Sequence, residues 1–229
     1  MVSDPKTAPE AEPKAEPNAV TEPKAVTKAA TRRRQLRDAL IAAAERTVAR
    51  EGLPGMKARD LAHEAGCAVG AIYNVFEDLD DLIFAVNART LDELEQTLTV
   101  AGAESADPHA DAIRTLVHLG LAYTDYAAAH RPRWRALFDH RLPQGRAVPA
   151  WYTANLHRLF DYIEAPLRKL APALPSDQRA LLARSLFSAV HGIVVIGLEE
   201  KLQRIPLSVL REQVTLMVQA MARGLAKAE

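Results

Sequence analysis

The sequence is poor in cysteine, aromatic residues and glycine. Cys67 is the only cysteine among 229 residues, which excludes a disulfide within the chain and a cysteine-built zinc site. Aromatic residues make up 5% and only 10 residues are glycine, too few for the aromatic strands and glycine turns of an all-β protein. Alanine, leucine, arginine and glutamate dominate instead, and all four favour helices. The composition therefore predicts an all-α protein.

The chain also lacks a net charge, with 29 Lys and Arg residues against 29 Asp and Glu residues. The charge is nevertheless unevenly distributed. Residues 32–76 hold eight basic and five acidic side chains, whereas the segments on either side are slightly acidic. Because nucleic acid responds to local rather than total charge, the neutral total does not exclude a nucleic-acid partner.

No apolar run reaches the roughly 18 residues of a membrane span, and no apolar stretch of a secretory signal follows Met1. We therefore expect a cytoplasmic protein with no membrane partner, for which a single cysteine is compatible with a reducing compartment. Residues 1–30 repeat proline among alanine, glutamate and lysine, which predicts a disordered, partly extended tail. A tether or docking arm is the alternative role for this tail.

After the tail, apolar residues at steps of three and four predict about nine helices and no strand. Asp78, Asp107-Pro108, Pro149 and Ser176-Asp177 supply caps or first-turn prolines at helix starts. The expected helices cover approximately 31–51, 58–65, 68–75, 79–101, 108–129, 133–140, 149–170, 176–202 and 206–227. We expect three parts: the tail at 1–30, a three-helix domain at 31–78 and a helical domain at 79–229.

The segment from Lys57 to Phe76 has the features of two short helices that cross over a tight turn. Leu61 and Ala62 are placed to face inward from the first helix, and Ile72 does so from the second. Gly66 permits the positive φ of the turn. This arrangement leaves the outer face of residues 68–74 free to probe a partner.

This segment resembles the DNA-binding domain of the TetR family of bacterial transcriptional regulators over about residues 32–85. The residues that match the family pattern are Leu61-Ala62, Ala65-Gly66, Gly70, Ile72-Tyr73, Phe76 and Asp81-Leu82. The resemblance implies an N-terminal helix-turn-helix three-helix domain and a C-terminal helical domain for ligand binding and dimerisation. In addition, Phe187 to Gly192 is similar to the Trp-x-x-x-His-Gly type of C-terminal domain, with Phe187 in the tryptophan's place.

The sequence departs from the family where Ala68 and Ala71 replace a usual serine and threonine, and where Leu79 replaces a phosphate-binding lysine. We therefore expect phosphate contacts to shift toward basic residues, including three arginines that precede the first helix. An exposed helix fits the major groove, where small apolar residues pack on thymine methyls and amides bond adenine. The expected DNA-binding residues are Arg32, Arg33, Arg34, Lys57, Arg59, Ala68, Val69, Gly70, Ala71, Tyr73 and Asn74.

For two of these groups the sequence leaves an alternative open. The three arginines have the composition of a solvated charge cluster, and Tyr73 can be a core tyrosine. By resemblance, Tyr73 contacts a phosphate, and its reach is sufficient for this role.

The last two expected helices carry wide apolar faces, which predicts a four-helix interface between two copies of the chain. The alternative is that both helices belong to the core. The expected dimer-interface residues are Leu186, Val190, Ile193, Leu210, Val214, Met217 and Met221. The middle helices hold most of the aromatic residues, which is typical of a ligand pocket but also of an ordinary core. The expected pocket residues are Tyr123, Trp134, Phe138, Trp151, Tyr152 and His191.

These features predict a DNA-binding transcriptional regulator, a repressor that a small-molecule effector releases from its operator. Its expected partners are a double-stranded DNA operator, an unknown effector and a second copy of the chain. The sequence contains no His-Glu-x-x-His motif, phosphate loop or serine elbow, so we expect no enzyme, metal or cofactor. The alternatives are a ligand-independent DNA-binding or interaction protein and a small helical enzyme.

Overall fold

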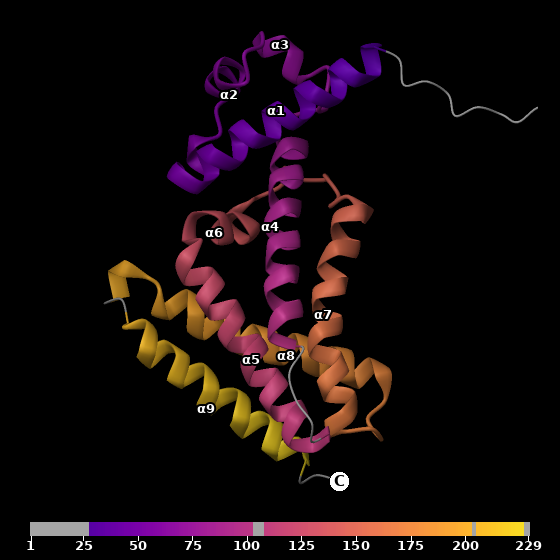
Figure 1. The fold of residues 1–229 in the computed structure, drawn as a ribbon, viewed down its shortest axis with the longest axis vertical. Helices are drawn as coiled ribbons and strands as arrows, with labels where there is room; N and C mark the ends of the chain where they lie inside the picture. Colours follow the sequence, from indigo (N-terminus) through magenta and orange to yellow (C-terminus); the bar gives the residue numbers. More distant parts are fainter. Residues whose placement is uncertain (1–27, 103–107, 203–204, 227–229) are drawn as a thin grey trace, which may run out of the picture.

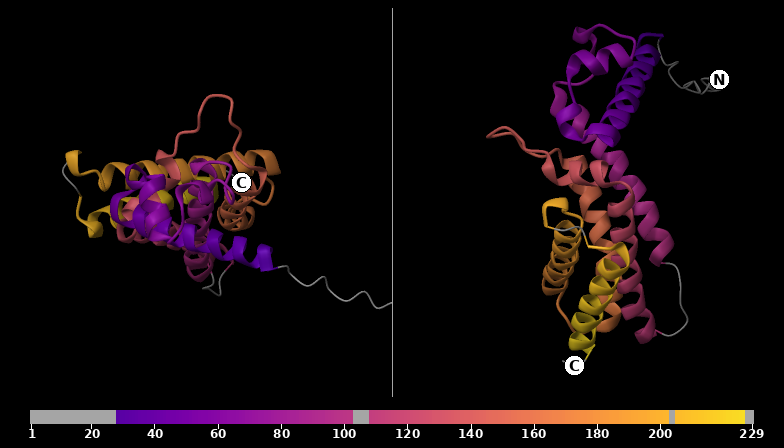
Figure 2. Two further views of the ribbon diagram at one scale, coloured as in Figure 1. Left: turned by 90° about the horizontal axis from the view of Figure 1, so that it is seen from above. Right: turned by 90° about the vertical axis from the view of Figure 1, so that its left-hand side faces the viewer.

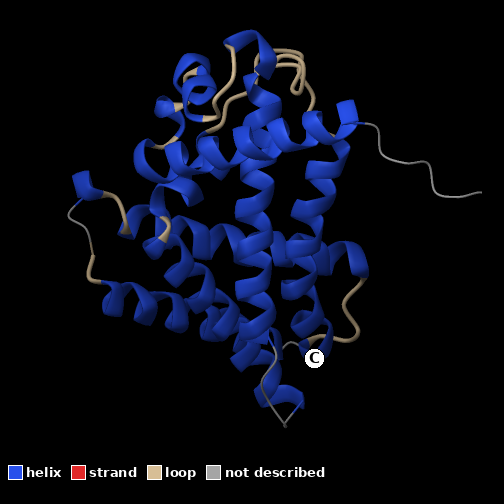
Figure 3. Cartoon of the chain, turned by 45° about the horizontal axis from the view of Figure 1, so that its top comes forward, coloured by secondary structure: helices blue, strands red, loops and turns tan. Residues whose placement is uncertain are grey.

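The computed structural model describes residues 28–102, 108–202 and 205–226, and its regular elements there are all helical (Figure 3). The predicted all-α class and the prediction of about nine helices are confirmed within these ranges. Of the tail predicted at 1–30, residues 1–27 lie outside the described ranges. Residues 28–30 already belong to the first helix, which therefore begins slightly earlier than expected.

Figure 1 shows the helices of the described ranges in chain order. Their bounds are α1 Lys28–Glu51, α2 Ala58–Glu64, α3 Val69–Ile72, α4 Leu79–Gly102, α5 Pro108–Ala129, α6 Arg131–Asp139, α7 Ala150–Leu170, α8 Ser176–Gly197 and α9 Leu207–Ala226, with short 3₁₀ turns at Leu53–Gly55 and Glu200–Leu202.

The molecule is elongated, with α1, α2 and α3 at one end and the larger helical bundle at the other (Figure 1, Figure 2). Helix α4 connects the two parts. It has 24 residues, which at 1.5 Å per residue gives a length of about 36 Å. Helices α8 and α9 pack against each other at the far end of the bundle, away from α2 and α3.

Two large apolar cores and a smaller cluster hold these parts together, and α4 contributes to all three. The N-terminal core joins α1, α2 and α3 around Leu40, Leu61 and Ile72, and it includes Leu82 of α4. The larger core centres on α5 and includes Leu94 of α4. Each fully buried leucine or isoleucine contributes about 1.5–3 kcal/mol, so α4 is held firmly at both ends.

Helix α6 links the two parts through a second route. Ala136 of α6 is buried in the N-terminal core, although the chain around it belongs to the larger bundle. The side-chain amide of Asn87 on α4, itself 1% exposed, donates a hydrogen bond to the Ala136 carbonyl at 3.1 Å. A displacement of α6 relative to α4 therefore also disturbs the N-terminal core.

Helix α8 is shorter than its apolar run predicts: it ends at Gly197, whereas the sequence predicted an end near Leu202. The Gly197 carbonyl accepts a hydrogen bond from the Ile205 amide at 3.0 Å, which turns the chain toward α9. The carboxylate of Glu199 then accepts a hydrogen bond from Arg135 of α6 at 3.1 Å. Helix α8 is also the one helix in the described ranges that is long and apolar enough to span a membrane, a property it shares with core helices of soluble proteins.

Candidate DNA-binding surface and ligand cavity

The turn between α2 and α3 has the geometry that the sequence predicts. Gly66 has a φ of 68°, a conformation that residues with a Cβ rarely adopt. The Cys67 amide donates to the Ala62 carbonyl at 2.9 Å, which closes the end of α2. Leu61, Ala62 and Ile72 are at most 1% exposed, so they fix the two helices against the core.

The α-helical part of α3 covers only Val69–Ile72, shorter than the predicted helix at 68–75. The chain continues as a hydrogen-bonded turn, in which the Val75 and Phe76 amides both donate to the Ile72 carbonyl. We refer to residues 68–74 as the recognition segment. Its inner side is anchored by Ile72, while Val69 is 40% and Tyr73 50% exposed. Large apolar groups at such exposure are available to a partner.

The other predicted DNA-contact residues lie around this segment. Lys57 directly precedes α2 and Arg59 lies in its first turn, and both are exposed. Gly70 is exposed, and a Cβ added there meets no atom within 4 Å, so the backbone is open to close approach. Ala71 is half-buried.

The three arginines do not precede the first helix, as the sequence suggested, but lie in the first two turns of α1. All three are exposed. Arg33 has a structural role as well, because its Nε donates to the Asn74 carbonyl at 3.1 Å. This bond ties the start of α1 to the end of the recognition segment. It also gives the Asn74 carbonyl a partner, which a carbonyl in the last turn of a helix does not find within its own helix.

A cavity of about 410 Å³ lies inside the larger bundle. Its walls come from helices α4 to α9, and most of its lining side chains are leucine, phenylalanine or other apolar residues. The volume falls in the range of small-molecule sites, roughly 300–1,000 Å³.

Of the six predicted pocket residues, Tyr123, Phe138 and Tyr152 line this cavity. Trp134 and His191 stand behind Tyr123 instead. The Trp134 indole donates to the Tyr123 hydroxyl at 2.9 Å, and that hydroxyl shares a hydrogen bond of 2.7 Å with His191 Nδ1. Trp151 is 49% exposed and lies outside the lining, with its ring edge toward Phe84.

Burial changes the acid–base properties of these residues. It raises the pKa of Tyr123 well above its usual range, and it raises the pKa of Tyr152 to about 12. Burial also lowers the pKa of His191, which favours a neutral ring. A neutral His191 with an unprotonated Nδ1 accepts a hydrogen bond from the Tyr123 hydroxyl, so that hydroxyl has a partner on both sides.

Sequence reasoning missed several lining residues. Leu91, Leu94 and Leu98 of α4 line the cavity, although they are not among the predicted pocket residues. Their spacing of three and four residues is the signal that places them on one face. His157 and Arg184 also line the cavity, but no pattern in the sequence distinguishes them from other surface residues.

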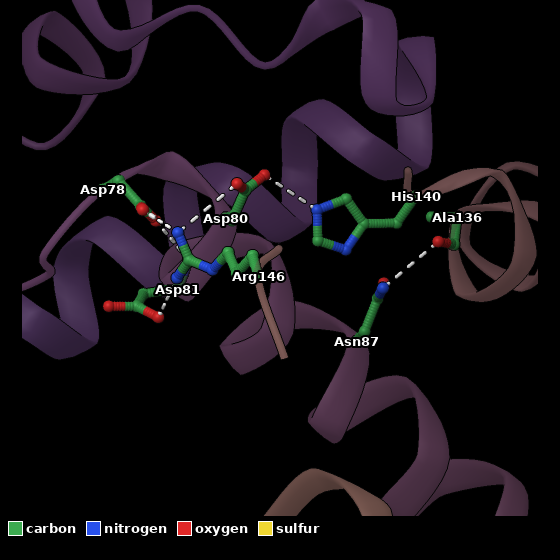
Figure 4. Close-up of polar contacts among 7 residues, drawn as sticks. All are labelled: Asp78, Asp80, Asp81, Asn87, Ala136, His140 and Arg146. Atoms are coloured by element: carbon green, nitrogen blue, oxygen red, sulfur yellow. Dashed lines mark hydrogen bonds and ion pairs between the residues drawn. The ribbon is translucent and has the colours of Figure 1, made fainter. Parts of the chain in front are cut away.

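A cluster of charged residues surrounds the N-terminus of α4 (Figure 4). Arg146, from the loop between α6 and α7, contacts Asp78, Asp80 and Asp81, with 2.7 Å to Asp81. His140 Nε2 lies 2.9 Å from Asp80 Oδ1. We call these five residues the α4 clamp. Asp78 also accepts the Asp81 amide at 3.0 Å and so caps the helix, as predicted.

The predicted dimer-interface residues fall into two groups. Leu186, Val190, Leu210 and Val214 are at most 6% exposed in a single chain. They are packed in the larger core of the single chain, so they offer little surface to a second copy, and their role in a dimer stays a prediction. Ile193, Met217 and Met221 are half-buried at the edge of that core. Apolar residues spaced three and four apart thus identified the buried faces of α8 and α9 rather than their exposed faces.

Helices α8 and α9 nevertheless expose large hydrophobic side chains among polar ones. These are Leu181, Val195 and Ile196 on α8 and Leu207, Val209 and Leu216 on α9. We call these six residues the α8–α9 patch.

Comparison with known proteins agrees with this architecture. Residues 40–86 match the family described as bacterial regulatory proteins of the tetR family, and residues 116–221 match the tetracyclin repressor-like C-terminal domain. An uncharacterised HTH-type transcriptional regulator of Mycobacterium tuberculosis is 31% identical over 160 residues, which cover 70% of this chain and 69% of the relative.

Two further relatives are similar over different lengths. The HTH-type transcriptional regulator BetI of Brucella abortus is 30% identical over 109 residues, 48% of this chain and 52% of BetI. A solved structure of a protein of unknown function from Rhodococcus sp. RHA1 is 28% identical, with a TM-score of 0.67 over 83% of this chain and 95% of that one. The chain thus belongs to the TetR family and is a DNA-binding transcriptional regulator rather than an enzyme.

Proposed function

We propose that this regulator is a cytoplasmic homodimeric repressor that leaves its operator when a small-molecule effector fills the apolar cavity. The observation that carries the proposal is the course of α4. The same helix supplies Leu82 to the core behind the recognition segment and Leu91, Leu94 and Leu98 to the cavity wall. A ligand that displaces α4 therefore moves the DNA-binding end as well.

The recognition segment is the part we assign to the major groove. Val69 and Ala71 pack on thymine methyls, Asn74 bonds adenine or phosphate, and the open backbone at Gly70 allows close approach. Tyr73 donates to a phosphate. Lys57, Arg59 and the exposed arginines of α1 supply further phosphate contacts, because their side chains flank the same surface.

One recognition segment presents few groups that read bases, so a single chain binds weakly. Helix-turn-helix proteins gain affinity by pairing on half-sites about one helical turn, roughly 34 Å, apart. We assign the pairing surface to the α8–α9 patch, because it holds the large hydrophobic side chains that the fold leaves exposed on these helices. Two chains paired through α8 and α9 form the four-helix interface expected from the sequence.

The α4 clamp is the element that we expect to transmit the effect of a ligand. Its Arg146 lies between α6 and α7, and both helices contribute cavity residues, Phe138 from α6 and Tyr152 from α7. A ligand that moves either helix changes the position of Arg146 and thereby its ion pairs with the aspartates at the start of α4. The expected coupling between ligand and operator is about 1–3 kcal/mol.

A gel-shift titration of the purified chain with DNA from upstream of its own and neighbouring genes tests the DNA-binding part. We expect a shift that weakens steeply as salt rises, because phosphate contacts release counterions. Replacement of exposed Tyr73 by alanine should abolish the shift while the thermal unfolding stays unchanged. Failure of the wild type to shift every promoter fragment at low salt would contradict the proposal.

A further inference from the structure

The exposed residues among those that line the cavity indicate where it opens. Three of its lining residues are exposed to solvent, and they come from three neighbouring helices: Phe138 of α6, His157 of α7 and Arg184 of α8. The other lining residues are buried or half-buried. A residue that both lines a cavity and faces solvent lies at its opening, so a ligand enters between α6, α7 and α8.

The mouth carries positive charge that the structure does not balance. Arg184 is the one lysine or arginine among the lining residues, which include no aspartate or glutamate. Its guanidinium lies over the Phe160 ring, 5.1 Å from the ring centre. Within the described ranges no carboxylate lies within ion-pair distance of Arg184. A guanidinium held by an aromatic ring keeps its charge and its planar set of donors for an anion.

The interior offers almost nothing polar. Its lining includes the buried leucines Leu94, Leu98 and Leu116. The Tyr123 hydroxyl is engaged by Trp134 and His191, and the Tyr162 hydroxyl lies 2.7 Å from Thr99 Oγ1. A polar molecule placed inside would lose its water without finding partners, which costs free energy. An alkyl chain gains free energy there for each methylene that it buries.

From this separation of charge and apolar surface we infer that the effector is an anionic amphiphile, an alkyl chain that ends in a carboxylate. The chain lies against the leucines of α4 and α5, and the carboxylate binds the Arg184 guanidinium at the mouth, with His157 beside it. This assignment specifies the ligand class of the effector site proposed above and rests on that proposed function. The 410 Å³ of the cavity limits the length of the chain that fits.

Direct binding of simple probes tests the assignment independently of DNA. Octanoate, decanoate, dodecanoate, dodecanol and dodecylamine are titrated into the full chain below their micelle concentrations, and heat is recorded by calorimetry. We expect affinity to rise about fourfold per added methylene until the cavity is full. Dodecanoate should bind about tenfold more tightly than dodecanol, because a charge-assisted hydrogen bond is formed with Arg184.

Two substitutions at Arg184 identify the head-group site. Arg184→Gln should weaken dodecanoate about tenfold and change dodecanol less than about twofold, because only the anion loses its partner. Arg184→Glu should reverse the preference and favour dodecylamine. Arg168→Gln is the matched control, since Arg168 is an exposed arginine of α7 that does not line the cavity. Retained dodecanol binding shows that each variant is folded.

Equal affinity of the wild type for dodecanoate and dodecanol, or an unchanged preference in Arg184→Gln, would overturn the assignment. So would an absence of binding for all of the probes. A gel shift with and without dodecanoate is recorded separately. Tight, Arg184-dependent binding that leaves the operator complex intact would contradict the proposed release mechanism but support the ligand class.

Discussion

Individual residues show most directly which side chains fix the backbone and which are available to a partner. In the recognition segment, Ile72 is fully buried, whereas its neighbour Tyr73 is half exposed. A buried apolar side chain fixes the position of the backbone, and the exposed neighbours are then presented in a defined orientation. Most of the residues assigned to DNA are accordingly exposed rather than part of the apolar core.

Gly70 gives a prediction that separates stability from binding. Because a Cβ at this position meets no atom within 4 Å, Gly70→Ala should raise the free energy of unfolding by about 0.5–1 kcal/mol. The added methyl lies where DNA approaches, so operator affinity should fall about tenfold, or about 1.4 kcal/mol. Thermal unfolding and fluorescence anisotropy measure the two effects. Gly102→Ala, also open but at the far end of α4, should leave operator affinity unchanged.

His191 predicts how stability depends on pH. Its pKa is lowered in the folded chain by burial, so the unfolded chain binds the proton more tightly. Stability should therefore fall as the pH drops through the ordinary histidine value of about 6.5. Urea unfolding measured between about pH 7.5 and pH 5.5 should show a smaller loss in His191→Gln than in the wild type. In exposed His63→Gln the loss should equal that of the wild type; the same loss in all three chains would refute this role of His191.

Single residues also mark the limit of what the sequence predicts. The burial of the residues that hold the recognition segment against the core was predictable from their spacing, because apolar residues three and four apart share one helix face. The role of Arg33 did not, since its bond to the Asn74 carbonyl joins residues 41 positions apart. Similarly, Trp134 and Trp151 were both predicted to line a pocket because they are aromatic residues of the middle helices. In the structure Trp134 is buried and Trp151 is half exposed.

Among the elements, α4 determines how the two parts communicate. Its first turn bears Asp80 and Asp81, and Asp78 precedes it as the cap, so three carboxylates interact favourably with the positive end of the helix dipole but repel one another. Arg146 offsets that repulsion from a loop that follows α6. The start of the helix is thus stabilised by a residue whose position depends on the cavity walls.

Removal of this contact should loosen α4 locally. In Arg146→Gln the backbone amides near the start of α4 should exchange hydrogen faster, with a loss of about 1 kcal/mol, since the clamp is partly exposed. Hydrogen exchange read by mass spectrometry measures this change. Arg141→Gln alters an exposed arginine of the same loop and should exchange like the wild type. Identical exchange in Arg146→Gln and the wild type would show that the clamp does not hold α4.

The helices show why their ends were harder to predict from the sequence than their buried faces. The stripe of α8 continued past Gly197, and only a backbone contact with Ile205 and the ion pairs of Glu199 ended the helix. The chain just after the shortened α3 is likewise bonded to Arg33 of α1. Both helix ends thus contact residues that are distant in the sequence, Arg33 near α3 and Arg135 near α8, and a local pattern does not record such contacts.

For the whole molecule, the main question is which surface joins two chains. Sequence periodicity selected Leu210 and Val214, which are 0% exposed, because an inward and an outward apolar stripe have the same period. The structure separates the two stripes. Leu216, 61% exposed on α9, is the most accessible member of α9 in the α8–α9 patch.

A charge placed on this patch should break the pair without unfolding the chain. Leu216→Glu should behave as a monomer in sedimentation and lose operator binding, while its unfolding free energy changes by less than about 0.5 kcal/mol. Gln96→Glu adds the same charge to an exposed site on α4 and should remain a dimer. A dimeric Leu216→Glu protein would place the interface elsewhere.

The distance between the two recognition segments of one operator complex tests the account most directly. Spin labels are attached at His63→Cys in a Cys67→Ser background, because His63 is exposed beside the turn and Cys67 is the only native cysteine. Pulsed dipolar spectroscopy should give one narrow distance, near one helical turn of about 34 Å or a multiple of it, on operator DNA. An absence of dipolar coupling, or a distribution that operator DNA leaves broad and unchanged, would contradict the claim that paired recognition segments read the double helix.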